Sequence, residues 1–133
     1  MKSNRATGNA FEQELCKLLF DKGFWCHNLK QDNAGQPADV IAVKNKVAYL
    51  IDCKDCSSKK FDLRRIEDNQ ETAMTLWDMC GNGVGWFAIK IENEIFFVDF
   101  AKLKHFTSIR GSLKHEHISF VGIPFGEWVK RCE

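Results

Sequence analysis

Three charged residues stand at the open end of a predicted β-hairpin, where their side chains could act together. Asp39 precedes one apolar run, and Asp52 and Lys54 stand at the end of the next. Because residues two apart on a strand share a face, Asp52 and Lys54 point the same way and Cys53 points the other way. The spacing therefore predicts carboxylates and an ammonium group gathered on one side of a strand end.

The register of this hairpin brings the two aspartates together. If the turn pairs Val43 with Ala48, the same ladder sets Asp39 opposite Asp52. Like charges opposed across a ladder are destabilising, and a divalent cation between them removes the conflict. Ligands that offer only oxygen suit Mg²⁺ or Mn²⁺. The alternative is that both aspartates are solvated strand ends and that Lys54 is their salt-bridge partner.

The same residues carry a resemblance to a nuclease superfamily. Pro37-Ala38-Asp39, followed by Asp52-Cys53-Lys54, resembles the PD-(D/E)XK motif. Glu12 resembles the first-helix glutamate of that superfamily, and Gln70 matches a glutamine on a later helix. The pattern is most similar to the Holliday-junction resolvases of archaea, phages and Gram-positive bacteria, over about residues 5–100. Two departures are an alanine between the proline and the aspartate, and aspartate instead of the usual glutamate before x-Lys.

The resemblance implies a metal-dependent endodeoxyribonuclease that hydrolyses phosphodiester bonds with Mg²⁺ or Mn²⁺. Asp39, Asp52 and the backbone carbonyl of Cys53 would be metal ligands, and Glu12 would bind through water or help a second metal. Lys54 would orient the attacking water and stabilise charge on the phosphate. The residues expected to be catalytic are Glu12, Asp39, Asp52, Lys54 and Gln70.

Two of these assignments have rivals within the sequence. Glu14 competes with Glu12, although Glu12 shares the helical stripe of Leu15 and Leu19 and is therefore favoured. Either glutamate could simply be an exposed helix carboxylate. Gln70 could be an ordinary helix-face amide, but its place on the apolar stripe of its helix directs it inward, toward the sheet.

The formal net charge of +1 excludes a polycation, so any DNA-binding surface must be local. Basic residues gather just past the motif and before the first helix, where they could contact phosphates without reading sequence. A solvated loop face is the alternative. The residues expected to contact DNA are Arg5, Lys59, Lys60, Arg64 and Arg65.

The expected substrate is branched DNA, in particular a four-way junction, cut by a homodimer whose twofold symmetry matches the two strands to be cleaved. The dimer is implied by the resemblance. Another nuclease of this fold, acting in repair or restriction, and a catalytically idle module that binds DNA or protein are the alternatives. No apolar run is long enough for a membrane span, and no export signal is visible, so we expect a cytoplasmic protein of a prokaryotic cell, phage or prophage.

The six cysteines are expected to be reduced thiols, because nothing in the sequence indicates export. Cys53-x-x-Cys56 could instead be half of a zinc site, with either His115 and His117 or Cys26 and His27 as the other half. The position of Cys53 within a strand and the lack of a second C-x-x-C weigh against zinc.

Periodicity predicts the elements that must position these residues. We expect a mixed α/β fold, with a sheet of about five strands flanked by helices and a restriction-endonuclease-like core in the order α-β-β-β-α-β. We treat residues 1–133 as one domain, in which residues 101–133 have no assigned role. The predicted helices are 8–22, 62–80 with Asp62 as its cap, a turn at 101–106, and 127–130; the predicted strands are 24–27, 39–43, 47–54, 85–91, 95–100 and 118–121.

Overall fold

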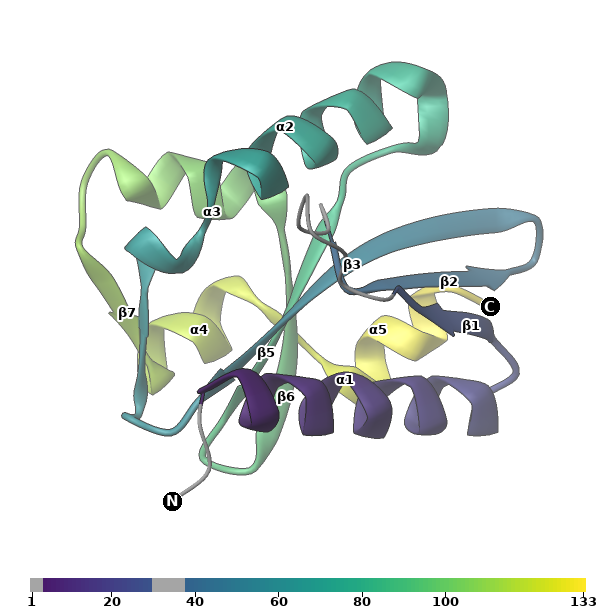
Figure 1. Ribbon diagram of the computed structural model, residues 1–133, viewed down its shortest axis with the longest axis horizontal. Coiled ribbons are helices and arrows are strands. Elements are labelled where there is room, and N and C mark those ends of the chain that lie inside the picture. The colour runs from purple at the N-terminus through teal and green to yellow at the C-terminus, as the bar shows by residue number, and fades with distance from the viewer. Residues whose placement is uncertain (1–3, 30–37) are drawn as a thin grey trace.

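Six strands form a mixed sheet with helices on both faces (Figure 1). The computed structural model describes residues 4–29 and 38–133, with side chains from Ala10 onward. The strands lie in the order β1-β2-β3-β5-β6-β8, in which β3 and β5 run parallel and the other neighbours are antiparallel. The strands of this sheet are β1 (Trp25–Asn28), β2 (Val40–Lys44), β3 (Val47–Cys56), β5 (Trp86–Ile91), β6 (Glu94–Asp99) and β8 (Ile123–Pro124).

The helices divide between the two faces of the sheet. α1 and α5 pack on one face, around Phe97 and Trp128, while α2, α3 and α4 pack on the other, around Phe87 and Ile89. A second sheet of two strands, β4 (Lys60–Asp62) and β7 (Ser112–Lys114), adds Phe61 to the second face. The helices are α1 (Asn4–Asp21), α2 (Asp68–Trp77), α3 (Phe100–Thr107), α4 (His115–Val121) and α5 (Phe125–Arg131), with short turns η1 (Leu63–Arg65) and η2 (Asp78–Asn82).

The first hairpin has the predicted register. Val43 pairs with Ala48 across a two-residue turn, and Asn45 and Lys46 both take positive φ there, as tight hairpins require. The ladder ends at Val40, so Asp39 stands just beyond it, on the level of Asp52. The backbone N–H of Asp39 still donates to the carbonyl of Ile51 at 3.1 Å, which ties the aspartate to the middle of β3.

The predicted mixed α/β fold is confirmed, with six strands in the main sheet where about five were expected. The first helix begins at Asn4, earlier than predicted, and the segment at 101–106 belongs to a longer helix, α3. The strand predicted at 118–121 is wrong, because these residues belong to α4. The two strands of the small sheet were not predicted.

The second helix also begins later than predicted. Asp62 does cap a helical turn by accepting a hydrogen bond from the backbone N–H of Arg64, but that turn is only η1. The chain then turns extended at Ile66, and α2 begins after Glu67. α2 ends at Trp77 and leads into η2, which runs to Asn82.

Within the described ranges, no helix combines the length and the apolar character that crossing a bilayer would need. Residues 30–37 lie outside the described part of the chain, as does the side chain of Arg5, one of the residues expected to contact DNA.

Candidate active site

The buried polar side chains of the described part of the chain coincide with the residues predicted to be catalytic. Each is at least nine-tenths buried, and the set comprises Glu12, Asp39, Asp52, Lys54 and Gln70. Burying charged groups is costly unless they are paired or bind a ligand. Because the other buried side chains in this part are apolar or thiols, these residues are the candidates for a functional site.

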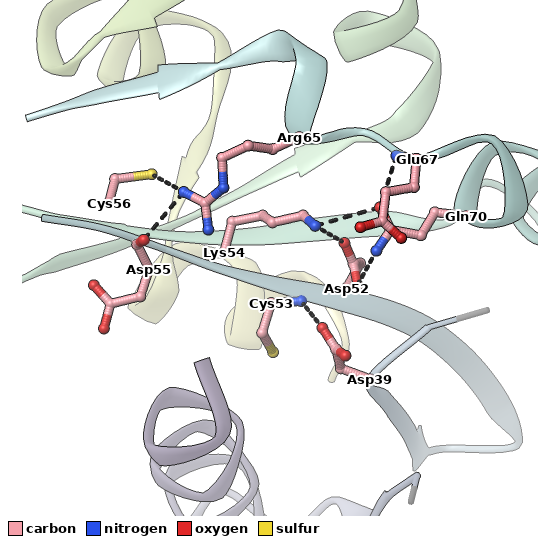
Figure 2. A network of polar contacts seen from close by, with 9 residues as sticks. All are labelled: Asp39, Asp52, Cys53, Lys54, Asp55, Cys56, Arg65, Glu67 and Gln70. Carbon is pink, nitrogen blue, oxygen red and sulfur yellow. Dashed lines mark hydrogen bonds and ion pairs between the residues drawn. The ribbon is translucent and has the colours of Figure 1, made fainter. Parts of the chain in front are cut away.

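Asp52, Lys54 and Gln70 form one network on the face of β3 that α2 covers (Figure 2). Asp52 is completely buried, and its Oδ2 lies 3.2 Å from Nζ of Lys54. Nζ also lies 3.3 Å from Oε1 of Gln70, while Nε2 of Gln70 donates to Oδ1 of Asp52 at 3.3 Å. The amide of Gln70 therefore contacts both Asp52 and Lys54. It points toward the sheet, as predicted.

Asp39 lies directly before the first residue of β2, beside a part of β3 that β2 does not reach. Its Oδ2 accepts a hydrogen bond of 2.7 Å from the backbone N–H of Cys53, across the edge of β3 that no longer has a strand partner (Figure 2). Glu12 approaches from α1, on the face of β3 to which Cys53 points. The three carboxyl groups thus come from three places in the fold: Glu12 from α1, Asp39 from just before β2 and Asp52 from the middle of β3, with Asp39 near both of the others.

Burial and neighbouring charge favour the neutral form of Glu12 and Asp52 by raising the pKa of each. Burial, followed by the charge of Asp39, raises the pKa of Glu12 to about 8. The same two causes, in the same order, raise the pKa of Asp52 well above its ordinary value, and Lys54 offsets them only in part. Asp39 is therefore close enough to act on both of the others, which is the repulsion that the hairpin register predicts.

The structure separates Glu12 from its rival Glu14. Glu12 is 7% exposed and faces the cluster, whereas Glu14 forms an exposed ion pair of 2.7 Å with Lys90. The helical stripe explains the difference, because Phe11, Leu15 and Leu19 are all buried on the sheet side of α1.

The basic residues after the motif differ in their surroundings. Arg65 donates to the backbone carbonyl of Asp55 at 3.1 Å and lies over the ring of Phe61, so it holds the end of β3 in place. Arg64 is engaged with Asp62 at 2.7 Å. Lys59 and Lys60 are exposed, and Lys60 stands directly opposite Lys114 in the small sheet.

A zinc site built on Cys53-x-x-Cys56 is ruled out by strand geometry. Residues three apart on a strand point to opposite faces, and Cys53 lies in the α1 core while Cys56 lies in the α2 core. The histidines proposed to complete it are engaged elsewhere: His115 contacts Glu92 and Glu94, and His117 contacts Arg110.

The chemistry of the site fits a hard divalent cation. Oδ2 of Asp52 is fully buried and has no hydrogen bond of good geometry within the described ranges. Carboxylate oxygens are the ligands that such cations prefer. Within the described ranges, no group of three His, Cys, Asp or Glu side chains is already placed to hold a metal ion.

Sequence reasoning missed the role of Glu67 in the site and the contact of Arg65 with Cys56. The backbone N–H of Glu67 donates to Oε1 of Gln70 at 3.1 Å, which fixes the amide from behind and forms part of a capping box. The spacing Glu67-x-x-Gln70 is the signal that could have shown it. The contact of Arg65 with Cys56 at 3.6 Å gives no such signal, because it depends on how η1 lies against β3.

This chain is similar to known proteins in both sequence and fold. A family model described as archaeal Holliday junction resolvase (Hjc) matches residues 3–133. A protein named crossover junction endodeoxyribonuclease Hjc, from Methanocaldococcus jannaschii, is 26% identical over 98% of this chain and 92% of its own length. The crystal structure of Hjc from Archaeoglobus fulgidus, described as a Holliday junction resolvase, shares the fold with a TM-score of 0.70 and 13% identity, over 93% of this chain and 99% of that one.

Proposed function

Because the chain belongs to the archaeal Holliday junction resolvase (Hjc) family, we propose that its cluster of buried carboxylates hydrolyses phosphodiester bonds in branched DNA. Endodeoxyribonuclease action on Holliday junctions with a divalent metal is the activity of this family. The observation that carries the assignment to this site is that Glu12, Asp39, Asp52, Lys54 and Gln70 are the buried polar residues of the described chain.

The metal in this proposal is Mg²⁺ or Mn²⁺, held by Asp39, Asp52 and the carbonyl of Cys53. A strand residue directs its N–H and C=O to the same edge, and the N–H of Cys53 meets Asp39 there, so its carbonyl lies at that edge too. Glu12 adds a carboxylate from the α1 side. A divalent cation at such a site neutralises phosphate charge and makes water a better nucleophile near neutral pH.

Lys54 is proposed to place its positive charge where negative charge grows on the phosphate. Its Nζ is held between Asp52 and Gln70, at 3.2 and 3.3 Å, so the ammonium group is oriented before the substrate arrives. Preorganised charge of this kind lowers the barrier because little reorganisation is needed in the transition state. The same N–H groups can donate to the attacking water.

DNA contact is proposed at Lys59 and Lys60, together with Lys114. Lys60 and Lys114 are paired across β4 and β7, and like charges opposed on a ladder repel each other. Both line a surface hollow with Lys59 and Ser58, and a phosphate group in it would relieve that repulsion. Arg64, Arg65 and Arg5 remain part of the proposed DNA-binding set, with the first two already bonded within the chain.

A homodimer is proposed as the active form, because a four-way junction has two equivalent strands to cut. We place its interface at the α3–α4 groove, which is lined by Ala101, Lys102, His105, Phe106, Phe120 and Val121. Support comes from Phe120, whose side chain is 88% exposed, more than any other large apolar residue in the described part of the chain. A second copy would cover this ring, which the monomer leaves in water.

Cleavage of a synthetic four-way junction tests the proposal. The protein is incubated with the junction, a plain duplex and single strands, in Mg²⁺, Mn²⁺ or EDTA. We expect paired nicks in the junction with either metal and none in EDTA. Asp52→Asn should lower the cleavage rate by at least about 10²-fold. Asp55→Asn is the matched control, because it makes the same change on the same strand, at a side chain directed away from the network (Figure 2).

The results that would contradict the proposal are distinct. Equal cutting of all three substrates would replace the junction resolvase with a general nuclease. Junction binding without cutting, unchanged by Asp52→Asn, would make this chain an idle member of the family. Equal loss in Asp52→Asn and Asp55→Asn would remove the assignment of catalysis to the buried cluster.

A further inference from the structure

A cysteine on α1, the helix that carries Glu12, contacts a cysteine on β1. Sγ of Cys26, on β1, donates a hydrogen bond to Sγ of Cys16, on α1, and the two sulfur atoms are 3.2 Å apart. Both side chains are partly exposed, so small oxidants in solvent can reach them. The other thiols differ: Cys53, Cys56 and Cys132 are buried, and Cys80 is exposed.

The connection between the two elements holds this pair in place. The carbonyl of Leu19 accepts hydrogen bonds from the backbone N–H groups of Lys22 and Phe24, at 3.0 and 3.1 Å. Gly23 supplies the left-handed conformation between them, with φ of 89°. Leu19 and Phe24 are buried on either side of the turn. The chain between the thiols therefore has little freedom to separate them.

The thiol contact is also chemically asymmetric. The hydrogen bond from Cys26 lowers the pKa of Cys16, while the same bond and burial raise the pKa of Cys26. Cys16 is thus the better nucleophile and Cys26 the thiol that keeps its proton. A nucleophilic cysteine with a second cysteine in contact is the arrangement from which disulfides form through a sulfenic acid.

We propose that Cys16 and Cys26 are a redox-active pair that closes to an intramolecular disulfide when the protein meets a hydroperoxide. The thiolate of Cys16 attacks the peroxide, the O–O bond breaks, and the alcohol or water formed takes up a proton. Sγ of Cys26 then attacks the sulfenic sulfur of Cys16, the S–O bond breaks, and hydroxide leaves with the proton of Cys26 as water. The two sulfur atoms lose two electrons and the peroxide gains them.

The disulfide joins α1 to β1 without dismantling the active site. The sulfur atoms are 3.2 Å apart and a disulfide bond is about 2 Å long, so closure needs a shift of only about 1 Å. Cys16 lies one helical turn after Glu12, so the cross-link fixes the part of α1 that presents this carboxylate. The expected consequence is a protein that melts at higher temperature and still cleaves.

The test uses full-length protein that carries Cys80→Ser, which removes the exposed thiol that could link two molecules. The reduced protein is treated with hydrogen peroxide, and its intact mass, disulfide-linked peptides and Tm are measured. We expect a loss of about 2 Da, a linked peptide pair containing Cys16 and Cys26, and a Tm rise on the order of 5–10 °C that dithiothreitol reverses. Cys16→Ser and Cys26→Ser should show neither the mass loss nor the Tm rise.

Three results would overturn the inference. The same mass loss in Cys16→Ser or Cys26→Ser would assign the disulfide to other cysteines. Gain of oxygen atoms in place of lost hydrogens would show that the two thiols do not resolve each other. A disulfide that leaves Tm unchanged would show that it does not brace α1. None of these readouts depends on DNA cleavage, so the inference stands or falls separately from the proposed function.

Discussion

At the scale of single residues, Gln70 connects the parts of the candidate active site. Its Oε1 accepts from Nζ of Lys54 and from the backbone N–H of Glu67, and its Nε2 donates to Asp52. One amide thus orients the carboxyl group of Asp52 and the side chain of Lys54 while it is anchored to the start of α2. A carboxylate here could not donate to Asp52, and a shorter side chain could not reach both partners.

Gln70→Ala is therefore expected to lower junction cleavage by about 10–100-fold, the usual effect of losing a group that orients metal ligands. The loss should appear in kcat, because DNA contacts on the exposed lysines are untouched. Single-turnover cleavage with saturating protein measures it. Thr72→Ala is the control, as it truncates an exposed residue on the same helix. Equal rates for the two variants would mean that Gln70 has no part in orienting the site.

Asp52 permits a prediction about metal binding that is independent of DNA. Millimolar Mg²⁺ or Mn²⁺ should raise Tm by a few degrees, since a ligand that binds only the folded state stabilises it, and EDTA should reverse the shift. Asp52→Asn should abolish the shift, while Asp55→Asn should keep it. Differential scanning fluorimetry measures all three proteins. A full shift in Asp52→Asn would place the metal elsewhere.

At the scale of elements, the C-terminal helix α5 completes the core under the sheet. The ring of Trp128 stacks on Phe97, with centroids 3.9 Å apart and planes 5° from parallel. It also contacts Phe24, Tyr49 and Trp86, so it links the helix to four places in one core. Part of the segment 101–133, to which the sequence assigned no role, therefore stabilises through α5 the face on which α1 rests.

Trp128→Ala should destabilise the protein by about 3–5 kcal/mol, the range for removing a buried aromatic side chain. Because Trp128 is 1% exposed, the cavity left behind would be lined by rings that cannot easily collapse into it. Urea unfolding followed by circular dichroism gives the free energy of unfolding. Trp25→Ala is the control, since this tryptophan is 61% exposed and its loss should cost little. Similar losses in both variants would contradict the role given to α5.

The sequence predicts elements well where the signal is local. The hairpin from Val40 to Cys56 follows from two apolar runs separated by a short polar turn, and pairing Val43 with Ala48 across that turn gives the register that sets Asp39 near Asp52. α4 could not, because Ile118–Val121 is rich in strand-forming residues and its seven-residue helix is set by packing of Ile118 and by His117, which accepts a hydrogen bond from the N–H of Lys114.

The candidate site shows the same division between local and distant signals. Asp52, Lys54 and Gln70 could be placed by the two- and 3.6-residue periods of their elements. The contact between Cys16 and Cys26 could not, because it depends on the way α1 crosses β1 through a turn fixed by Gly23. Periodicity predicts on which face of a helix or strand a side chain lies. The residue that it contacts there depends on how whole elements pack against each other.

At the scale of the whole molecule, some phenylalanines of the C-terminal half are buried in the core and one is exposed on the surface. Phe96, Phe97 and Phe100 are buried on the two faces of the sheet, so β6 is covered within one chain and is not free for another. β8 pairs with its outer edge through Phe96 and Phe97. Phe120, on α4, is left in solvent beside Phe106 and Val121. These exposures are why we propose the dimer contact at the α3–α4 groove.

Phe120→Ser should convert the proposed dimer to a monomer without unfolding it, because this ring is 88% exposed and contributes little to the core of its own chain. Sedimentation velocity gives the mass in solution, and a cruciform plasmid reports whether both strands are cut within one binding event. We expect the variant to sediment as a monomer and to release singly nicked plasmid, since each subunit can cut only one of the two equivalent strands.

Met79→Ser is the matched control, as Met79 is 78% exposed on a different surface, next to α2. A dimer that persists in Phe120→Ser but dissociates in Met79→Ser would move the interface to the α2 surface, and a wild-type monomer that cuts both strands would remove the need for a dimer.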